Sequence, residues 1–323
     1  MARLLLRRLA HGALIVWLVA TATFFLLHVA PGDPVGTTLA SPLTPPEVRT
    51  YWRHVYGLDR PLPEQYARYL SSLARGELGF SFPHQRPVRD LLADAIPNSL
   101  LLMGVSIVLA FTLGIGLGIV QAAAHGRPLD WGLGVGALFF YSMPDFWLAL
   151  MMVLVFAYAL RLFPVNGMVD AVLYPYLGLW GRLADRLRHL VLPATTLALL
   201  SAAAIARYQR AALLDVAREP FILAARAKGL SERRLMLHHS LRNALLPVIT
   251  IFGLAFPALL GGTVFVEGIF SWPGMGLLTY EAISNRDYPL LVAVVIIASV
   301  LVVLGSLVAD MLYALADPRV RAG

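Results

Sequence analysis

Cysteine is absent from the 323 residues, and Lys228 is the only lysine. Without cysteine the chain has no disulfide, no zinc thiolate site and no thiol nucleophile. Charged residues are scarce at 14%, whereas hydrophobic residues reach 59%. A soluble domain of this composition would leave too much apolar surface in water, so we expect a single-bundle membrane protein.

The signatures of several enzyme classes are also missing. Lys228 precedes Gly229 and Leu230, so it cannot complete the phosphate-binding loop of an ATPase. His238 and His239 are adjacent and therefore face different sides of a helix, unlike a metalloprotease pair. No serine has the flanking glycines of a nucleophile elbow. We expect no catalytic residue, no metal site and no enzyme activity, although an intramembrane enzyme stays an alternative.

Six apolar stretches are long enough to cross a bilayer, and they occupy about 9–30, 98–124, 131–161, 190–213, 244–267 and 289–315. The arginines gather on alternate connections, and their side is expected to be the cytoplasm, with both termini inside. This topology explains the net charge of +7 without a nucleic-acid partner. The first stretch is longer than a signal-peptide core and precedes Pro31, so we interpret it as an anchor.

The expected domains follow from these spans. They are an anchor (1–30), an external segment (31–97), a five-helix core (98–316) that contains a cytoplasmic loop (214–246), and a cytoplasmic tail (317–323). The external segment is expected to form short helices near the outer surface, or else a solvated spacer.

Proline and glycine residues predict a kink and close helix packing within the expected spans. Pro144 should kink the third span. The pairs Gly114 with Gly118 and Gly132 with Gly136 have the spacing of close helix packing. Asp145 lies about 21 Å along a straight third helix from Trp131. Pro144, Asp145 and Phe146 are therefore candidates for a translocation pathway, with a wet vestibule or a subunit pairing as the alternative for Asp145.

A second candidate site lies at the outer end of the fifth span. Glu267 precedes a turn in which Pro273, Gly274 and Gly276 predict a tight reversal. The turn is interpreted as an outer gate or a contact with an external protein, or equally as a structural corner.

The loop from Arg218 to Pro247 carries the strongest local signals. Pro220 suits the first position of a helix, and Gly229 suits the left-handed residue that ends one. Ser231 then predicts the cap of a second helix. The first helix is too short to be stable alone, so it must pack against something, with Phe221 as an anchor and alanines as a close docking face. A basic loop held by lipid phosphates is the alternative.

The chain resembles ABC importer permeases of the peptide and nickel branch. The loop carries this resemblance in "AARAKGL" (224–230) followed by "LRNALLP" (241–247). Similar segments occur in order along nearly the whole chain: "APGDPV", "YGLDRPLPEQYARYL", "GELGFSF", "RPVRDLLADAIPNSL", "SMPDFWL", "VEGIFSWPGMGLL", "RDYPLL" and "DMLYALADPRVR". Leu223 and Arg242 stand where the general importer motif has a glutamate and a proline, and the branch itself usually lacks that glutamate. Pro220 stands where an acidic residue is commoner, and Ser306 where the branch often has asparagine.

The resemblance implies an all-α membrane protein with the type I ABC importer permease fold in a bacterial inner membrane. It implies a heterodimer with a second homologous permease, two cytoplasmic ABC ATPases that bind the ATP and magnesium, and an external solute-binding protein. The residues implied to couple to an ATPase are Phe221, Ala224, Ala225, Arg226, Ala227, Lys228, Gly229 and Leu230.

Function is then predicted as import of a peptide or a related small solute, whose identity the sequence leaves open. Gly229→Pro and Ala225→Glu are expected to uncouple transport from ATP hydrolysis. A gradient-driven carrier is the main rival, and it would be expected to show repeated halves and buried charges at mid-membrane.

Overall fold

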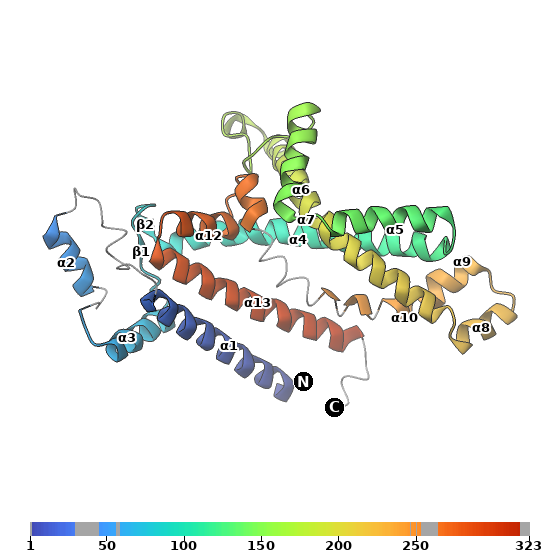
Figure 1. Ribbon diagram of the computed structural model, residues 1–323, viewed down its shortest axis with the longest axis horizontal. Coiled ribbons are helices and arrows are strands. Elements are labelled where there is room, and N and C mark those ends of the chain that lie inside the picture. The colour runs from blue at the N-terminus through green and yellow to red at the C-terminus, as the bar shows by residue number, and fades with distance from the viewer. Residues whose placement is uncertain are drawn as a thin grey trace. The chain divides into compact units, whose positions relative to one another are not determined.

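A computed structural model describes residues 2–29, 45–55, 59–245, 247–249, 251–252 and 264–316 (Figure 1). The expected tail (317–323) and the middle of the expected fifth span lie outside these residues. The chain forms two compact units, which are Met1–Ser99 with Pro273–Val303 and Leu100–Trp272 with Leu304–Gly323.

Helices dominate both units. The first unit contains α1 (Ala2–Val29), α2 (Pro46–Val55), α3 (Leu62–Ala74), β1 (Phe80–Ser81), β2 (Arg86–Pro87) and α12 (Met275–Ser284). The second contains α5 (Pro128–Tyr141), α6 (Asp145–Met152), the π-helical η1 (Val153–Ala159), the 3-10 turn η2 (Tyr174–Tyr176), α7 (Leu179–Val216), α8 (Pro220–Ala227), α9 (Glu232–Arg234), the π-helical η3 (Leu235–Ser240) and α10 (Leu241–Ala244). Two helices have residues in both units, α4 (Val88–Ala123) and α13 (Tyr288–Ala316).

Within the described residues, four helices are long and apolar enough to cross a membrane: α1, α4, α7 and α13. They confirm four of the expected spans. With 36 and 38 residues, α4 and α7 exceed the length of one crossing. Both helices begin about ten residues before the expected start of the span. The additional residues are a mixture of polar and apolar types, which form a helix but are not recognised as a span by hydropathy.

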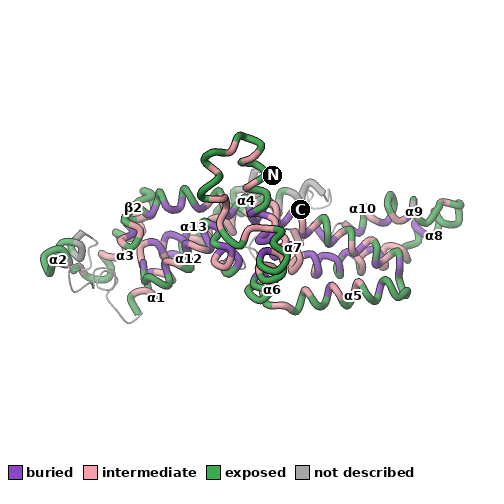
Figure 2. Tube along the Cα trace, turned by 90° about the horizontal axis from the view of Figure 1, so that it is seen from above, coloured by how far each residue is buried: buried purple, intermediate pink, exposed green. Residues whose placement is uncertain are grey.

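The third expected span is broken rather than kinked. α5 and the α6–η1 segment are bent by 104° at the short break between them. Pro144 lies in the break, as expected, and immediately precedes α6. Its ring removes a backbone donor and disfavours a helical conformation for the residue before it. Large apolar side chains along α5, such as Trp131 and Phe139, are exposed. The trace of α5 is coloured as exposed over much of its length in Figure 2.

The core of the first unit joins the start of α4 to α12 and α13. Val88 and Leu290 are fully buried there. The antiparallel β1–β2 hairpin was not expected from the sequence. The short helices expected in the external segment are confirmed as α2 and α3. The second of these lies against α1, where the Tyr69 hydroxyl donates to the Ala20 carbonyl at 3.1 Å.

Two glycines set the packing of the second unit. A Cβ on Gly114 would lie 2.6 Å from Ile205 Cβ, and one on Gly118 would lie 2.9 Å from the Ala206 carbonyl oxygen. α4 and α7 therefore approach too closely for any side chain at these positions, which confirms the expected close packing. Among the described residues, no atom lies within 4 Å of such a Cβ on Gly132 or Gly136, so close packing at that pair is not seen within the described part of the chain.

Candidate functional site

The candidate site in the loop from Arg218 begins at the end of α7. The Ala217 N–H donates to Leu213 O, and the Glu219 N–H donates to Val216 O, both at 3.0 Å. Pro220 then occupies the first position of α8, where its missing donor costs nothing, as expected. The chain passes from the long α7 into the short α8 through a hydrogen-bonded turn rather than a loose linker.

The other end of α8 is closed by Gly229. Its φ is +82°, and its N–H donates to Arg226 O at 2.9 Å, while the Leu230 N–H reaches Ala225 O at 3.4 Å. This pair of bonds is a Schellman ending, which satisfies carbonyls that the helix end would leave open. The prediction that a left-handed glycine ends the first helix is confirmed.

The second helix of the loop differs in detail from the expectation. Ser231 occupies the N-cap position, but its side chain makes no capping hydrogen bond, so the expected hydroxyl cap is wrong. Its backbone carbonyl instead accepts from the N–H of Arg234 and of Leu235 at 2.9 Å. The helix then widens into the π-helical η3 before α10.

An ion pair that sequence reasoning missed spans the Gly229 turn. Arg226 Nε donates to Glu232 Oε1 at 2.6 Å, and Arg226 Nη2 donates to Oε2 at 3.0 Å. These hydrogen bonds lower the pKa of Glu232 and raise that of Arg226. Their spacing of six residues is no helix-neighbour signal, so local sequence patterns do not predict this contact.

α8 has two different faces. Ile222 is only 1% exposed and lies where α8 packs against η3. On the other side Phe221 is 47% exposed and Leu223 is 50% exposed. Ala224, Ala227 and Lys228 are exposed as well, whereas Ala225 and Leu230 are half-buried (Figure 2). The helix is thus held from one side and presents an apolar surface of small and large side chains on the other.

The expected pathway residues lie at the break between α5 and α6. Asp145 is the first residue of α6, half-buried, and Phe146 beside it is 47% exposed. The expected position of Asp145 about 21 Å along a straight helix is wrong, because the chain bends before this residue. A carboxylate at this position is favoured by the free N–H groups of the helix start.

The expected outer turn is built differently from its sequence pattern. The left-handed residue is Ser271, with φ +48°, whereas Gly274 is extended and Gly276 is buried inside α12. Pro273 O accepts from Asn98 Nδ2 at 2.8 Å. Glu267 is fully buried, and it belongs to the second unit while Pro273, Gly274 and Gly276 belong to the first.

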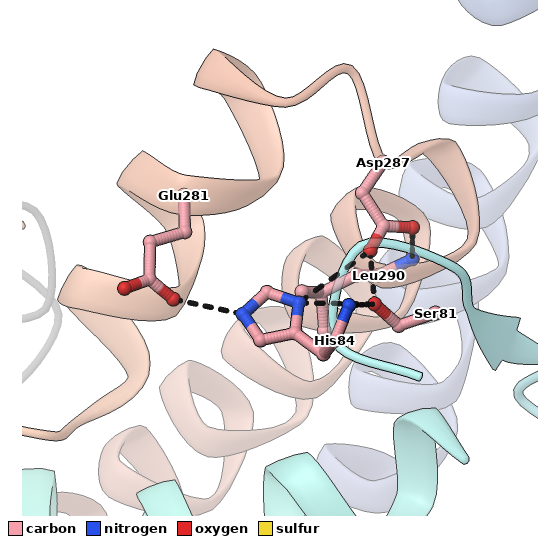
Figure 3. Close-up of polar contacts among 5 residues, drawn as sticks. All are labelled: Ser81, His84, Glu281, Asp287 and Leu290. Atoms are coloured by element: carbon pink, nitrogen blue, oxygen red, sulfur yellow. Dashed lines mark hydrogen bonds and ion pairs between the residues drawn. The ribbon is translucent and has the colours of Figure 1, made fainter. Parts of the chain in front are cut away.

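A polar cluster in the first unit ties the β1–β2 turn to α12 and α13 (Figure 3). The buried Ser81 hydroxyl donates to Asp287, and His84 Nδ1 lies 3.0 Å from Ser81 Oγ. His84 Nε2 lies 3.0 Å from Glu281 Oε2. The serine proton goes to a carboxylate rather than to the histidine, and Ser81 has no exposed surface, so the cluster lacks the arrangement of an activated nucleophile. Its contacts fasten the hairpin.

Comparison with known proteins gives full-length matches. Residues 114–322 match the family described as binding-protein-dependent transport system inner membrane component, and residues 1–103 match the N-terminal region described for such membrane components. The oligopeptide transport system permease protein AppB of Bacillus subtilis (strain 168) is 39% identical over 99% of this chain and 100% of its own length. The di/tripeptide transport system permease protein DppB of Pseudomonas aeruginosa (strain UCBPP-PA14) is 39% identical over 94% of each chain.

Among solved structures, a chain of the inward-facing MetNI methionine ABC transporter has the same fold. Its TM-score is 0.57 at 18% sequence identity, and the match covers 72% of this chain and 98% of that chain. The expected permease fold is therefore confirmed, although the count of six spans and the sides of the termini stay predictions.

Proposed function

This chain belongs to the binding-protein-dependent transport system inner membrane component family, and on that premise we propose that it forms half of a translocation pathway for peptides. It is a permease component of an ABC importer. The peptide substrate is supported by the two relatives named for oligopeptides and for di- and tripeptides, which match over nearly the whole chain. A nickel chelate is a less favoured cargo.

The proposed assembly contains four kinds of component. This chain pairs with a second homologous permease in a bacterial inner membrane, two cytoplasmic ABC ATPases bind ATP and magnesium, and an external solute-binding protein delivers the cargo. Hydrolysis of ATP takes place in the ATPases, so this chain has no catalytic role of its own. The inner-membrane location is supported by the family description and by the long apolar helices.

We propose that α8 docks on one of these ATPases. The observation that carries this assignment is the two-faced α8, which is fixed inward by Ile222 and exposes Phe221 and Leu223 outward. Burying the exposed half of each of these side chains against a partner contributes roughly 1 kcal/mol each. Leu223 stands where the general importer pattern has a glutamate, so this contact is apolar rather than ionic in this chain.

Coupling requires that α8 move as a unit with the spans. Its start is fixed by hydrogen bonds to the end of α7 and its finish by the Gly229 turn. A change that ATP causes in the ATPases can shift the permease only if α8 binds the two states of the ATPase with different affinities. Because α8 is held at both ends, a movement of the ATPase surface bound to α8 is passed on to α7.

The docking assignment is tested with Ala224→Glu, which places a charge on the exposed face of α8. Ala93→Glu, at an exposed position of α4 in the other unit, is the matched control. Copurification of the ATPases, ATP hydrolysis and peptide uptake are measured on the whole complex in proteoliposomes. We expect Ala224→Glu alone to abolish stimulated hydrolysis and uptake. Normal uptake by Ala224→Glu would contradict docking through α8.

The cargo is tested separately. The solute-binding protein is purified under native conditions, and the ligand bound to it is identified by mass spectrometry. A mixture of short peptides supports the proposal, whereas a metal chelate or another solute would replace peptides as the cargo and leave the α8 assignment unaffected.

A further inference from the structure

The second unit contains an ion pair that the proposed docking does not use. Arg210 on α7 meets Asp130 in the first turn of α5 at two points, with Nε–Oδ1 and Nη2–Oδ2 both 2.7 Å. Asp130 is only 8% exposed. Two parallel bonds to a planar guanidinium fix orientation as well as distance, so the pair restrains rotation and sliding of α5 on α7.

The turn between α4 and α5 also contacts the Arg210–Asp130 ion pair. The Gly126 N–H donates to Asp130 Oδ2 at 3.1 Å, and Arg210 Nη2 donates to His125 Nδ1 at 3.2 Å. We call Asp130, Arg210, His125 and Gly126 the clamp. It connects α4, α5 and α7 near the end of α7 that leads into α8.

The clamp adds to the apolar packing of the same helices. Gly118 on α4 meets α7 without room for a side chain, and α5 packs along α7. A motion applied at α8 reaches α7 first, because the turn at Ala217 and Glu219 is hydrogen-bonded. Whether α5 and the α4–α5 turn follow depends on contacts such as the clamp, which resist shear between helices.

We propose that Arg210 and Asp130 are positioning residues that pass the displacement of α8 from α7 to α4 and α5. The inference rests on the proposed docking of α8. With the clamp, the three helices move as one body during the transport cycle. Without it, α7 follows the ATPase while α5 lags behind, so ATP is hydrolysed without complete movement of the pathway.

The test measures ATP hydrolysed per peptide imported by the complete transporter in proteoliposomes. Arg210→Lys keeps the charge but loses the two-point geometry. We expect it to raise this ratio at least several-fold, with normal assembly, heat stability and ATP hydrolysis. The matched control is Arg86→Lys, which alters the exposed Arg86–Asp94 pair in the other unit, at 2.9 Å, and should leave the ratio unchanged.

A second variant separates mechanical transmission from loss of charge. The chain has no cysteine, so Asp130→Cys combined with Arg210→Cys offers two unique thiols. We expect the double variant to be uncoupled, and a short bifunctional thiol reagent to restore the ratio by joining α5 to α7. A monofunctional reagent of the same chemistry is the control, and it should leave the ratio of ATP hydrolysed to peptide imported as high as in the unmodified double variant.

The outcomes distinguish this inference from the proposed docking. If Ala224→Glu abolishes coupling while Arg210→Lys keeps the unmodified ratio, the clamp inference is overturned and docking through α8 stands. If Ala224→Glu is without effect, docking itself fails. If both clamp variants lose assembly and ATP hydrolysis, and cross-linking does not restore them, the ion pair has only a structural role. That result would overturn the inference.

Discussion

Arg226 and Glu232 form a two-point ion pair across the Gly229 turn, so the end of α8 and the start of α9 are held together by side chains as well as by backbone. Both side chains are exposed, so the pair is screened by solvent and modest in strength. Its effect is to restrict the angle between the two short helices at the surface proposed for docking.

Glu232→Gln should loosen this turn. Because Arg226 lowers the folded-state pKa of Glu232 below the usual glutamate range, the pair is present at neutral pH and is lost as the pH falls through this lowered pKa. Hydrogen exchange in residues 220–234 should increase roughly twofold in the variant at neutral pH. The two proteins should converge in acid. Asp94→Asn, which removes the exposed partner of Arg86, is the control, and equal exchange in all three at neutral pH would contradict the prediction.

Gly229→Ala should weaken the end of α8 by about 1 kcal/mol, because φ +82° is costly for any residue with a Cβ. No atom of the described residues lies within 4 Å of such a Cβ, so the cost within this part of the chain is conformational. Gly76→Ala carries the same backbone cost, with φ +74° and open space around it. We expect reduced peptide uptake only for Gly229→Ala. A similar reduction in both would show that the effect is general instability.

Gly118→Ala should destabilise the second unit. The added Cβ would lie 2.7 Å from Gln209 Cβ and 2.9 Å from a backbone oxygen, and overpacking of this kind costs about 1–3 kcal/mol. Gly116→Ala on the same helix meets no atom within 4 Å in the part of the chain that the structure describes, and it should be neutral or slightly stabilising. Thermal unfolding of the purified complex compares the two, and equal midpoints would refute the close packing of α4 on α7.

Asp145→Asn tests whether the start of α6 lines the pathway for peptides. If the carboxylate attracts the ammonium group of a peptide, its loss should slow uptake about tenfold, equivalent to about 1.4 kcal/mol. Asp90→Asn is the control, because Asp90 is also an acid in the first turn of a helix and is exposed. Unchanged uptake by Asp145→Asn at normal expression would remove this residue from the pathway.

Ser81→Ala should release the hairpin from α12 and α13. The substitution removes a donor to Asp287, whose side chain is fully buried, at a cost of about 1–3 kcal/mol. Ser142→Ala is a mild control, since that exposed hydroxyl donates only to the Leu138 carbonyl of its own helix at 2.9 Å. Protease sensitivity of residues 79–87 should rise for Ser81→Ala alone. Identical digestion of both variants would argue against the fastening role of the cluster.

Local signals predicted much of the candidate docking site. Pro220 and Gly229 defined both ends of α8 from conformational preferences that act within one or two turns. Pro144 likewise located the break in the third span. The size of that bend, 104°, was not predicted, because proline removes a hydrogen bond but the packing of neighbouring helices sets the direction of the chain.

The sequence by itself determined the membrane class, four long spans and the bounds of α8, because hydropathy and backbone preferences are properties of short segments. Only the tertiary structure decided that Gly114 and Gly118 pack against α7, while Gly132 and Gly136 meet no neighbour among the described residues. It also decided that Arg210 meets Asp130 across 80 residues of sequence and that Ser81 meets Asp287 across 206. Such pairs depend on how distant segments are brought together, and no local preference of the chain encodes that distance.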